Sequence, residues 1–482
     1  MTLDGSVRPE TAADPTTDPT PDADGPAETP GGRSAWSALR PLVLRLHFYA
    51  GVLVAPLLLV AATSGLLYAL SFQAEKVVYA HELTVPVGER TVPLSQQVHA
   101  AKKVNPGGTV TAVWPSAEPG ATTRVLMADP SVKEGTSLAV FVDPYTAEVR
   151  GQLPSYGSSG ALPLRTWLDE LHRDLHLGEL GRNYSELAAS WLWVVALGGL
   201  ALWIGRRRRA RRELFLPERG PKSRRRTLSW HGAVGLWAVT GLVLLSATGL
   251  TWSRWAGENI DAVRSQLGGA TPAVSAVIGA GTGEGTTGHE GHAGHGGGAP
   301  AQAATGPDVG IDKVVAAARE AGVDGRIAVT LPAEGKAYVV KQTDTQFPVH
   351  LDSVAVNPAD GAVMDQLRFA DYPLLAKLTR FGIDAHTGVF LGLANQLALA
   401  ALALALILLI VWGYRMWWLR RPGRPVARGA WRKVPPTMLL PLLAGTALVG
   451  WFVPMLGISL LVFLAVDVLL GLMARARARR EA

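Results

Sequence analysis

Long apolar runs alternate with polar segments along the 482 residues of the chain. Four runs are close to or above the ~20 residues that cross the hydrocarbon core of a bilayer: 36–70, 187–206, 229–252 and 389–418. A fifth run, 437–474, is too long for one ordinary crossing and contains Pro441 and Pro454. It predicts either one tilted helix or a tight helical hairpin.

Arginines at the ends of these runs decide between the two. Arg40 and Arg45 lie at the start of the first run, and a cluster at 206–209, 211, 212 and 224–226 joins the second run to the third. Arg415, Arg420, Arg421 and Arg424 lie at the end of the fourth run, and Arg475, Arg477, Arg479 and Arg480 lie at the C-terminus. Positive flanks stay cytoplasmic. We therefore expect six helices in the cytoplasmic (inner) membrane. The disordered tail 1–35, the basic linkers 207–228 and 419–436 and the tail 475–482 are expected in the cytoplasm.

The segments 71–186 and 253–388 are then expected outside the membrane, and both have an α+β pattern. Each contains one stretch with helical spacing followed by three strand-like stretches. In the first segment these are 94–104, then 109–114, 123–128 and 137–142; in the second they are 311–321, then 326–330, 337–341 and 350–356. The predicted fold class is a membrane α-helical protein, internally duplicated, with two small α+β extracytoplasmic domains.

Composition excludes several kinds of chemistry. The chain has no cysteine, so thiolate metal sites, iron–sulfur clusters and cysteine nucleophiles are ruled out. The net charge of +7 arises from basic residues beside apolar runs, as membrane topology places them, so we expect lipid and not nucleic acid as the partner. Redox chemistry would therefore need a bound cofactor.

The second half of the chain repeats the first. Val140-Phe-Val-Asp143-Pro144 returns as Val354-Ala-Val-Asn357-Pro358, and His47 with Gly65 returns as His231 with Gly249. Asp174-Leu-His176-Leu-Gly178 returns as Asp384-Ala-His386-Thr-Gly388. Within each matched set the difference in residue number is constant. Both halves start inside, leave and return, so they are predicted to be parallel repeats.

Four of the repeated residues are histidines at membrane boundaries. His47 and His231 lie five helical turns from their glycines and are expected near the cytoplasmic side, whereas His176 and His386 precede the returning helices and are expected outside. Facing pairs of histidines beside glycines are the ligand set of a bis-histidine haem, so we predict two b-type haems with Gly65 and Gly249 making room beside the outer pair. His172 is a reserve ligand or a propionate contact, because the alignment of His176 with His386 places Gly382 opposite it. The alternative is that helix-end histidines only bond to backbone, which does not explain their recurrence in register.

These residues resemble the PepSY-associated transmembrane proteins, also called iron-regulated membrane proteins, which include di-haem siderophore reductases. The resemblance covers about residues 36–420 and rests on Leu46-His47 through Gly65, Trp230-His231 through Gly249 and the strand ends at Pro144 and Pro358. It implies PepSY folds in both outer segments. It also implies haem ligation by the four repeated histidines.

Two features have weaker meaning. His289, His292 and His295 lie three apart in a glycine-rich insert and are candidate ligands for a divalent transition metal, with a flexible linker as the alternative. Asp467 is the only acidic residue within the predicted membrane spans, and we expect it to pair with a neighbouring helix.

The predicted function is transmembrane electron transfer by a membrane oxidoreductase similar to ferric-chelate reductases. A cytoplasmic or membrane donor, a quinol or a reductase, would supply electrons, and a ferric siderophore or other ferric chelate would accept them outside. Two alternatives remain open. One is a PepSY-type regulatory or ligand-binding protein that restrains a peptidase, and the other is a metal or siderophore permease without haem.

Overall fold

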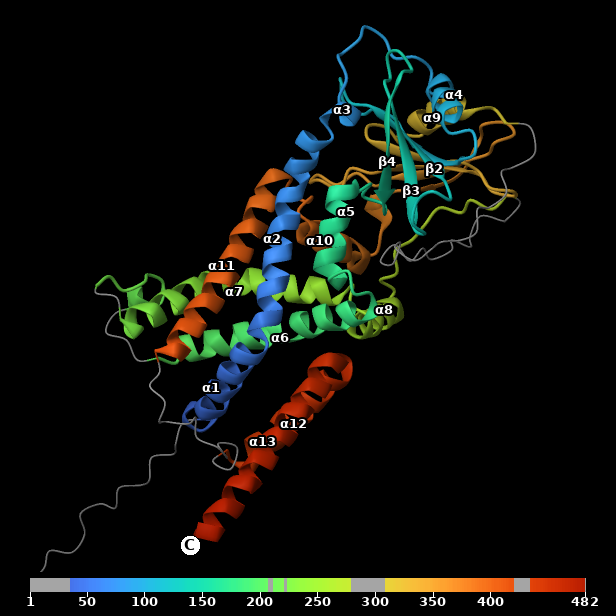
Figure 1. The fold of residues 1–482 in the computed structure, drawn as a ribbon. Helices are drawn as coiled ribbons and strands as arrows, with labels where there is room; N and C mark the ends of the chain where they lie inside the picture. The colour runs from blue at the N-terminus through green and yellow to red at the C-terminus, as the bar shows by residue number, and fades with distance from the viewer. Residues whose placement is uncertain (1–34, 207–210, 221–222, 279–307, 420–433, 482) are drawn as a thin grey trace, which may run out of the picture.

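The computed structural model describes residues 35–206, 211–220, 223–278, 308–419 and 434–481. Within these ranges a bundle of long helices carries a β-sheet at one end (Figure 1). The metal candidates His289, His292 and His295, the tail 1–34 and most of the linker 419–436 lie outside the described residues.

One antiparallel sheet contains strands from both halves of the chain. Its order is β4-β3-β2-β1-β5-β6-β7-β8. The first half supplies four strands: β1 (Thr109–Trp114), β2 (Thr123–Ala128), β3 (Thr136–Val142) and β4 (Val149–Tyr156). The second half supplies the other four: β5 (Ile327–Thr330), β6 (Tyr338–Gln342), β7 (Ser353–Val356) and β8 (Val363–Leu367).

The sequence predicts two separate small domains, and the structure corrects this by joining them. β1 pairs with β5 through Ala112 opposite Thr330 and Val113 opposite Val329. Equivalent strands that pair antiparallel are related by a local two-fold rotation. The junction is favourable because it removes an exposed strand edge from each unit.

Each unit also has a fourth strand that the sequence analysis does not predict. β4 and β8 are mostly half-buried or exposed along their length, so they lack the run of buried apolar positions that marks β3. Their backbones nevertheless pair fully with β3 and β7. Tertiary pairing, and not local pattern, forms these edge strands.

Two helices cover one face of the sheet. α4 (Leu94–Val104) and α9 (Ile311–Glu320) pack on the central strands and form a single apolar core with them (Figure 1). Asp312 at the start of α9 accepts hydrogen bonds from the backbone N–H groups of Leu94 (2.7 Å) and Ser95 at the start of α4. The two units therefore share a core as well as a sheet.

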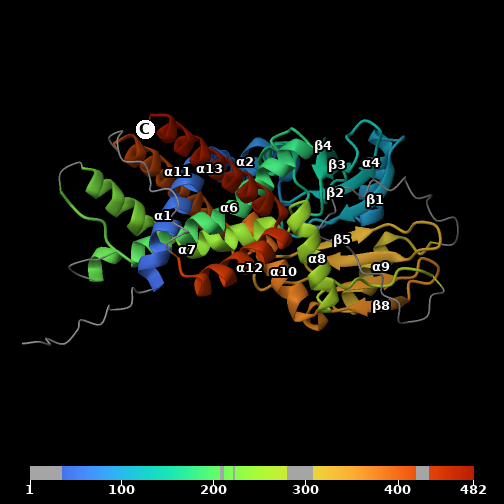
Figure 2. The ribbon, with the colours of Figure 1, turned by 90° about the horizontal axis from the view of Figure 1, so that it is seen from below.

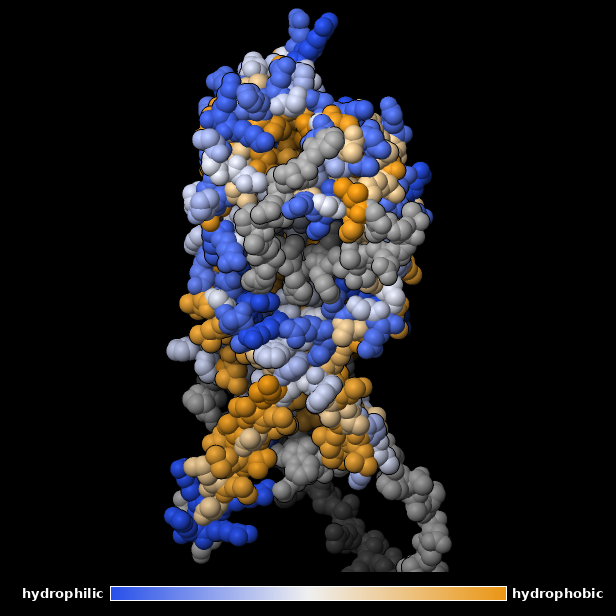
Figure 3. Space-filling model, turned by 90° about the vertical axis from the view of Figure 1, so that its right-hand side faces the viewer, coloured by the Kyte–Doolittle hydropathy of each residue, from blue (hydrophilic) through white to orange (hydrophobic). Residues whose placement is uncertain are grey.

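Five helices within the described residues are long and apolar enough to cross a membrane: α2 (Ala55–Val78), α6 (Glu179–Ile204), α7 (Arg224–Leu250), α11 (Leu393–Trp418) and residues 454–477 of α13 (Pro454–Glu481). A shorter apolar helix, α12 (Pro436–Phe452), precedes α13. The protein is thus a multi-pass membrane protein. Apolar surface replaces polar surface on passing from the sheet to the helices (Figure 3).

The first predicted membrane helix, 36–70, is two helices in the structure. α1 (Ala35–Leu53) ends before Val54, and α2 begins at Ala55 with Pro56 in its first turn. Proline cannot donate the hydrogen bond that would continue the helix. His47 and Gly65 therefore lie on two segments, whereas α7, which carries His231 and Gly249, is unbroken.

The two halves interleave in the membrane. α2 of the first half packs against α11 of the second, and α6 of the first half packs against α7 of the second. Three further helices lie between the membrane helices and the sheet: α5 (Pro163–Asp174), α8 (Trp255–Gln266) and α10 (Leu374–Thr387) (Figures 1 and 2). Short helical turns complete the described fold: α3 (Ala80–Leu83), η1 (Arg211–Leu214) and η3 (Phe369–Asp371).

Candidate cofactor site

Two histidines face each other at the end of the bundle away from the sheet. The rings of His47 on α1 and His231 on α7 have centroids 6.4 Å apart at an interplanar angle of 74°. We call them the sheet-distal pair. One residue comes from each half, as the repeat predicts.

Equivalent residues hold the two rings. His47 Nδ1 lies 3.0 Å from the carbonyl oxygen of Val195, and His231 Nδ1 lies 3.0 Å from that of Leu409. A Cβ placed on Gly199 would lie 2.9 Å from His47 Cε1, and one placed on Gly413 would lie 4.0 Å from His231 Cε1. These supports on α6 and α11 are related by the same offset in residue number as the strand ends at Pro144 and Pro358. Because a carbonyl only accepts, both Nδ1 atoms carry the proton and both Nε2 atoms keep a lone pair.

A second pair lies at the sheet end of the bundle. His172 on α5 and His386 on α10 have ring centroids 6.4 Å apart at an interplanar angle of 49°. His172 Cε1 would lie 3.2 Å from a Cβ on Gly65, and His386 Cε1 would lie 3.4 Å from a Cβ on Gly249. We call these histidines the sheet-proximal pair. The glycines make room beside it, as predicted.

Hydroxyl groups hold this pair in place of carbonyls. Ser64 Oγ lies 3.0 Å from His172 Nδ1, and Thr248 Oγ1 lies 2.7 Å from His386 Nδ1. Each hydroxyl already donates its one hydrogen to its own helix, Ser64 to Val60 O (2.9 Å) and Thr248 to Leu244 O (2.7 Å). With their hydrogens donated to these carbonyls, the hydroxyl oxygens accept from Nδ1–H, and in the neutral ring Nε2 then keeps its lone pair.

The structure does not bring His176 to His386, so the expected outer pairing of these two residues is wrong. His176 follows the end of α5 with a positive φ of 55°, and its ring lies 5.0 Å from that of Trp167. Its Nδ1 lies 3.3 Å from Glu170 Oε2. The residue placed beside His386 is His172, which the sequence analysis ranks as a reserve.

The reason is a change of register within the repeat. The Asp-x-His-x-Gly motif aligns His176 with His386, but His176 lies after the end of α5 at Asp174, whereas His386 lies inside α10, which continues to Thr387. The helix N-caps Gly178 and Gly392 have nearly the same backbone angles, φ 58° ψ −131° and φ 55° ψ −133°, so they are structurally equivalent. His172 precedes Gly178 by the same interval as His386 precedes Gly392. His172 and His386 are separated by the same number of residues as the strand ends Pro144 and Pro358, and this separation is longer than that between His176 and His386. The strand ends could therefore have identified the pair from the sequence.

A cavity of about 380 Å³ opens between the two sheet-proximal histidines. Its walls include both histidines, Gly65, Gly249 and aliphatic residues of α2, α6, α7 and α11. Its polar lining includes three arginines: Arg173, Arg182 and Arg254. This volume falls within the range of small-molecule and cofactor sites.

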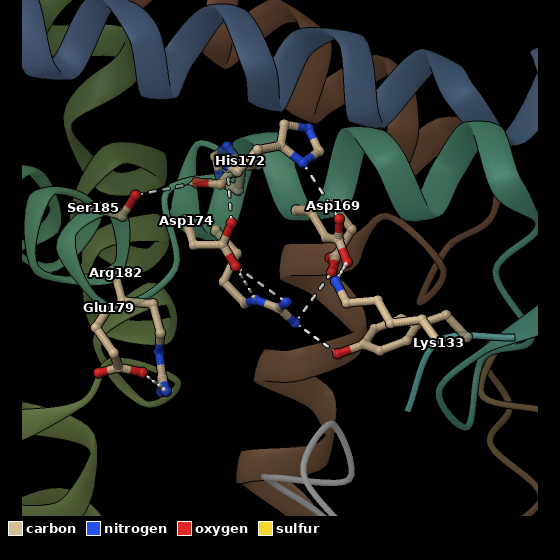
Figure 4. Close-up of polar contacts among 11 residues, drawn as sticks. Lys133, Asp169, His172, Asp174, Glu179, Arg182 and Ser185 are labelled. Carbon is tan, nitrogen blue, oxygen red and sulfur yellow. Dashed lines mark hydrogen bonds and ion pairs between the residues drawn. The ribbon is translucent and has the colours of Figure 1, made fainter. Parts of the chain in front are cut away.

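Ion pairs order these arginines. Arg173 contacts Asp169 and Asp174. Arg182 contacts Glu179 (Figure 4), and Arg254 contacts the same carboxylate. The surrounding carboxylates and Tyr156 outweigh burial and raise the pKa of Arg173, so this guanidinium is charged. Burial raises the pKa of Asp169. The cavity therefore combines apolar walls with ion-paired arginines, and the carboxylates of Asp169 and Glu186 also line it.

Burial also keeps the sheet-proximal histidines neutral. It lowers the pKa of His386 to about 3, with a further contribution from the nearby His172, and it lowers the pKa of His172 itself. Neutral imidazole is the form that ligates a metal. The four histidines are thus arranged as two facing pairs, each of which could hold one metal-centred cofactor.

The sequence analysis missed buried carboxylates on the membrane helices, Glu75 of α2 and Glu186 of α6. α6 begins at Glu179, well before the predicted span 187–206, so Glu186 lies within a membrane helix and is 1% exposed. Its oxygens accept from the backbone N–H groups of Trp255 (3.0 Å) and Ala256 (2.9 Å) at the start of α8. A carboxylate at a helix N-terminus is electrostatically favourable, which explains why the charge is tolerated there. The polar stretch 183–186 concealed this part of the helix.

Asp467 has the expected partner. It is half-buried and pairs with Arg45 of α1, whose side chain is buried. No group of three or more histidine or acidic side chains in the parts of the chain that the structure describes could hold a metal ion by itself.

The fold and site define a duplicated multi-pass membrane protein with two histidine pairs in the bundle and one shared sheet. The family model for the PepSY-associated TM region matches residues 44–420, and the chain belongs to this family. No curated protein matches the chain. The family model ends before α12, so the C-terminal helices lie outside the matched region.

Proposed function

We propose that each histidine pair holds one b-type haem and that the protein transfers electrons across the membrane to an acceptor on the sheet side. The observation that carries the proposal is the common geometry of the two pairs. A bound haem would supply reversible one-electron chemistry at each site.

The spacing of the rings fits two axial ligands on one metal. Two metal–nitrogen bonds of ~2 Å each, plus ~1 Å from each nitrogen to its ring centre, separate the centroids by ~6 Å. Both pairs have centroids 6.4 Å apart. Their Nδ1 atoms are engaged by protein oxygens, which fixes the tautomer that leaves Nε2 for the metal.

The surroundings fit a planar macrocycle with acidic side chains. Gly65 and Gly249 leave flat helix surface beside the sheet-proximal rings, where larger residues would meet the histidines. Arg173, Arg182 and Arg254 provide positive charge at the same cavity, suited to carboxylates. The chain's part in the chemistry is to hold, orient and shield the cofactors.

The charge distribution gives the direction. Arg206, Arg224 and Arg415 lie at or beside the sheet-distal ends of α6, α7 and α11, and each belongs to a basic cluster of the sequence. Positive flanks remain cytoplasmic. The sheet-distal pair then faces the cytoplasm and the sheet lies outside. We infer six crossings, with α12 and α13 as the last two, and both termini in the cytoplasm.

The proposed reaction is the one-electron reduction of Fe(III) to Fe(II) in an external chelate, with the electron drawn from a cytoplasmic or membrane donor. Hard oxygen chelators hold Fe(II) less tightly than Fe(III), so reduction favours release of the metal. A ferric siderophore is the proposed acceptor. The arginines near the sheet-proximal cavity would favour approach by acceptors that carry negative charge.

The test is a visible spectrum of the purified protein combined with haem quantification. The proposal predicts two haems per chain, with low-spin bis-histidine spectra, that dithionite reduces and an added ferric chelate reoxidises. A preparation from haem-sufficient cells that contains no haem would contradict the proposal. That result would favour the ligand-binding or permease alternatives.

A further inference from the structure

The C-terminal helices α12 and α13 form a hairpin that packs against the side of the bundle (Figures 1 and 2). Gly450 and Gly457 make its tight turn, where a Cβ on Gly457 would lie 2.5 Å from the carbonyl oxygen of Gly450. Many side chains of the hairpin are apolar and exposed, as expected for a lipid-facing surface. The hairpin follows the region matched by the family model, so its role is not given by family membership.

Three polar contacts fix the hairpin to the bundle at different depths. Near its turn, Asn259 Nδ2 of α8 donates to Phe452 O (3.0 Å). Further along, Trp191 Nε1 of α6 donates to Ser459 Oγ (2.8 Å). At the sheet-distal end, Arg45 of α1 pairs with Asp467.

The Arg45–Asp467 pair is the one charged contact among these three. Arg45 is 6% exposed, and Asp467 is its only acidic partner among the described residues. Charges in such surroundings are costly unless they are compensated. The Arg45 guanidinium also lies 5.6 Å from the centre of the Tyr49 ring, and Tyr49 in turn packs against Phe463 of α13.

The pair acts on the helix that presents His47. Arg45 and His47 are next-but-one neighbours on α1 and therefore point to opposite sides of it. His47 contacts α6 through Val195, and Arg45 contacts α13. α1 is thus held from both sides at the level of the sheet-distal pair.

The second half uses a different device at the equivalent position. Ser229 precedes His231 as Arg45 precedes His47, and it is buried and accepts a hydrogen bond from the backbone N–H of Glu218 (2.9 Å). The segment 211–220 therefore covers α7 where the hairpin covers α1. The hairpin completes the first half with a charge pair that the second half lacks at this position.

We propose that the hairpin is a positioning element of the sheet-distal site, and that Asp467 holds α1 and cancels the Arg45 charge beside His47. This inference rests on the proposed function, because the site it positions is the proposed cytoplasmic-side haem site. An uncompensated positive charge near a haem disfavours the ferric state and raises the midpoint potential. Loss of the Asp467 charge should therefore affect one site and not the other.

The experiment is a redox titration of the full-length Asp467→Asn protein. We expect two haems, with reduction of the sheet-distal haem favoured by about tenfold, a shift of ~59 mV, and with the sheet-proximal haem unchanged. The same titration in the His386→Ala background isolates the sheet-distal site. Ser459→Ala is the matched control, since it removes a hairpin contact without changing charge and should leave both potentials in place.

A second variant keeps the test decisive if Asp467→Asn does not accumulate. Arg45→Gln combined with Asp467→Asn removes both charges, and we expect two haems with potentials close to those of the wild type. Unchanged potentials in Asp467→Asn, equal shifts at both sites, or a tenfold shift in the double variant would overturn the inference. A haem-free wild-type protein would instead overturn the proposed function, so the two failures are distinguishable.

Discussion

The sheet-distal and sheet-proximal histidine pairs have the same ring separation but different supports. Main-chain carbonyls of α6 and α11 accept from the sheet-distal rings, whereas the hydroxyls of Ser64 and Thr248 accept from the sheet-proximal rings. A carbonyl position is set by a whole helix, but a hydroxyl depends on one side chain. A single substitution therefore cannot remove the acceptor of a sheet-distal ring. A single substitution of Ser64 or Thr248 can remove the acceptor of a sheet-proximal ring and so change the properties of that ligand.

The surroundings of the two pairs also affect which oxidation state of a bound metal is favoured. A hydrogen-bond acceptor on Nδ1–H makes the imidazole a more basic ligand, and arginines line the sheet-proximal cavity. Basic ligands favour the oxidised metal, and nearby positive charge favours the reduced metal. Because the Nδ1 atoms of both pairs have an oxygen partner, the arginines are what distinguishes the two sites. Within the proposed function, they favour electron movement toward the sheet side.

Substitution of the glycines next to the histidine rings is expected to cause the largest loss of haem. A methyl group would lie 2.9 Å from His47 Cε1 at Gly199, 3.2 Å from His172 Cε1 at Gly65, 3.4 Å from His386 Cε1 at Gly249 and 4.0 Å from His231 Cε1 at Gly413. The closest of these contacts forces a shift, and the longest is ordinary van der Waals contact. We expect the loss of haem on substitution by alanine to follow that order, with Gly199→Ala nearly emptying the sheet-distal site.

Haem quantification of the four purified variants measures this series. Gly413→Ala is the matched control for Gly199→Ala, because both glycines support the same pair and are equivalent in the repeat. Equal haem content in these two variants would show that the steric ranking of the supports does not govern binding.

Intermediate effects are expected from the sheet-proximal hydroxyls. Ser64→Ala and Thr248→Val remove the acceptors of His172 and His386, and such partners of metal-bound histidines typically contribute ~10-fold or more in affinity. We expect about tenfold weaker haem retention at the sheet-proximal site alone, measured by transfer to apomyoglobin. Thr63→Ala is the control, since Thr63 bonds to Leu59 O on an exposed face. Equal losses from both sites would contradict the assignment.

The smallest effect concerns cavity charge. Arg182→Gln removes one positive charge from the sheet-proximal cavity but leaves Arg254 to pair with Glu179. We expect a lower midpoint potential at that site, by less than a tenfold change in the reduction equilibrium because the group is partly solvated. Potentiometry should detect no change at the sheet-distal site. A rise in the sheet-proximal potential would have the wrong sign for this account.

Much of this architecture follows from local sequence. The apolar runs predict the long helices, and the recurrence of His47 and Gly65 as His231 and Gly249 predicts the sheet-distal pair. The joining of β1 and β5 depends on how two distant units meet, which no local pattern encodes. Pro56 is a signal for the helix break at Val54, but the run is apolar on both sides of it and therefore reads as one continuous helix.

The sheet-proximal pair shows how a short motif can mislead. The residues around His176 match those around His386, yet the longer-range offset that relates the strand ends and Gly178 to Gly392 selects His172. At the longer offset Asp174, the last residue of α5, corresponds to Gly388, directly after the end of α10, so the two helices end at equivalent positions. The Asp-x-His-x-Gly motif lies four residues later in the first half than this equivalence requires, so local similarity aligned the wrong histidine. Contact with Gly65 and Ser64 resolves the choice.

A comparison of His172→Ala with His176→Ala tests which histidine is the partner of His386. Both side chains belong to the same turn region, but only His172 faces His386. We expect one haem per chain in His172→Ala, with the sheet-distal bis-histidine spectrum retained, and two haems in His176→Ala. Two haems in His172→Ala together with one in His176→Ala would show that His176, and not His172, is the ligand.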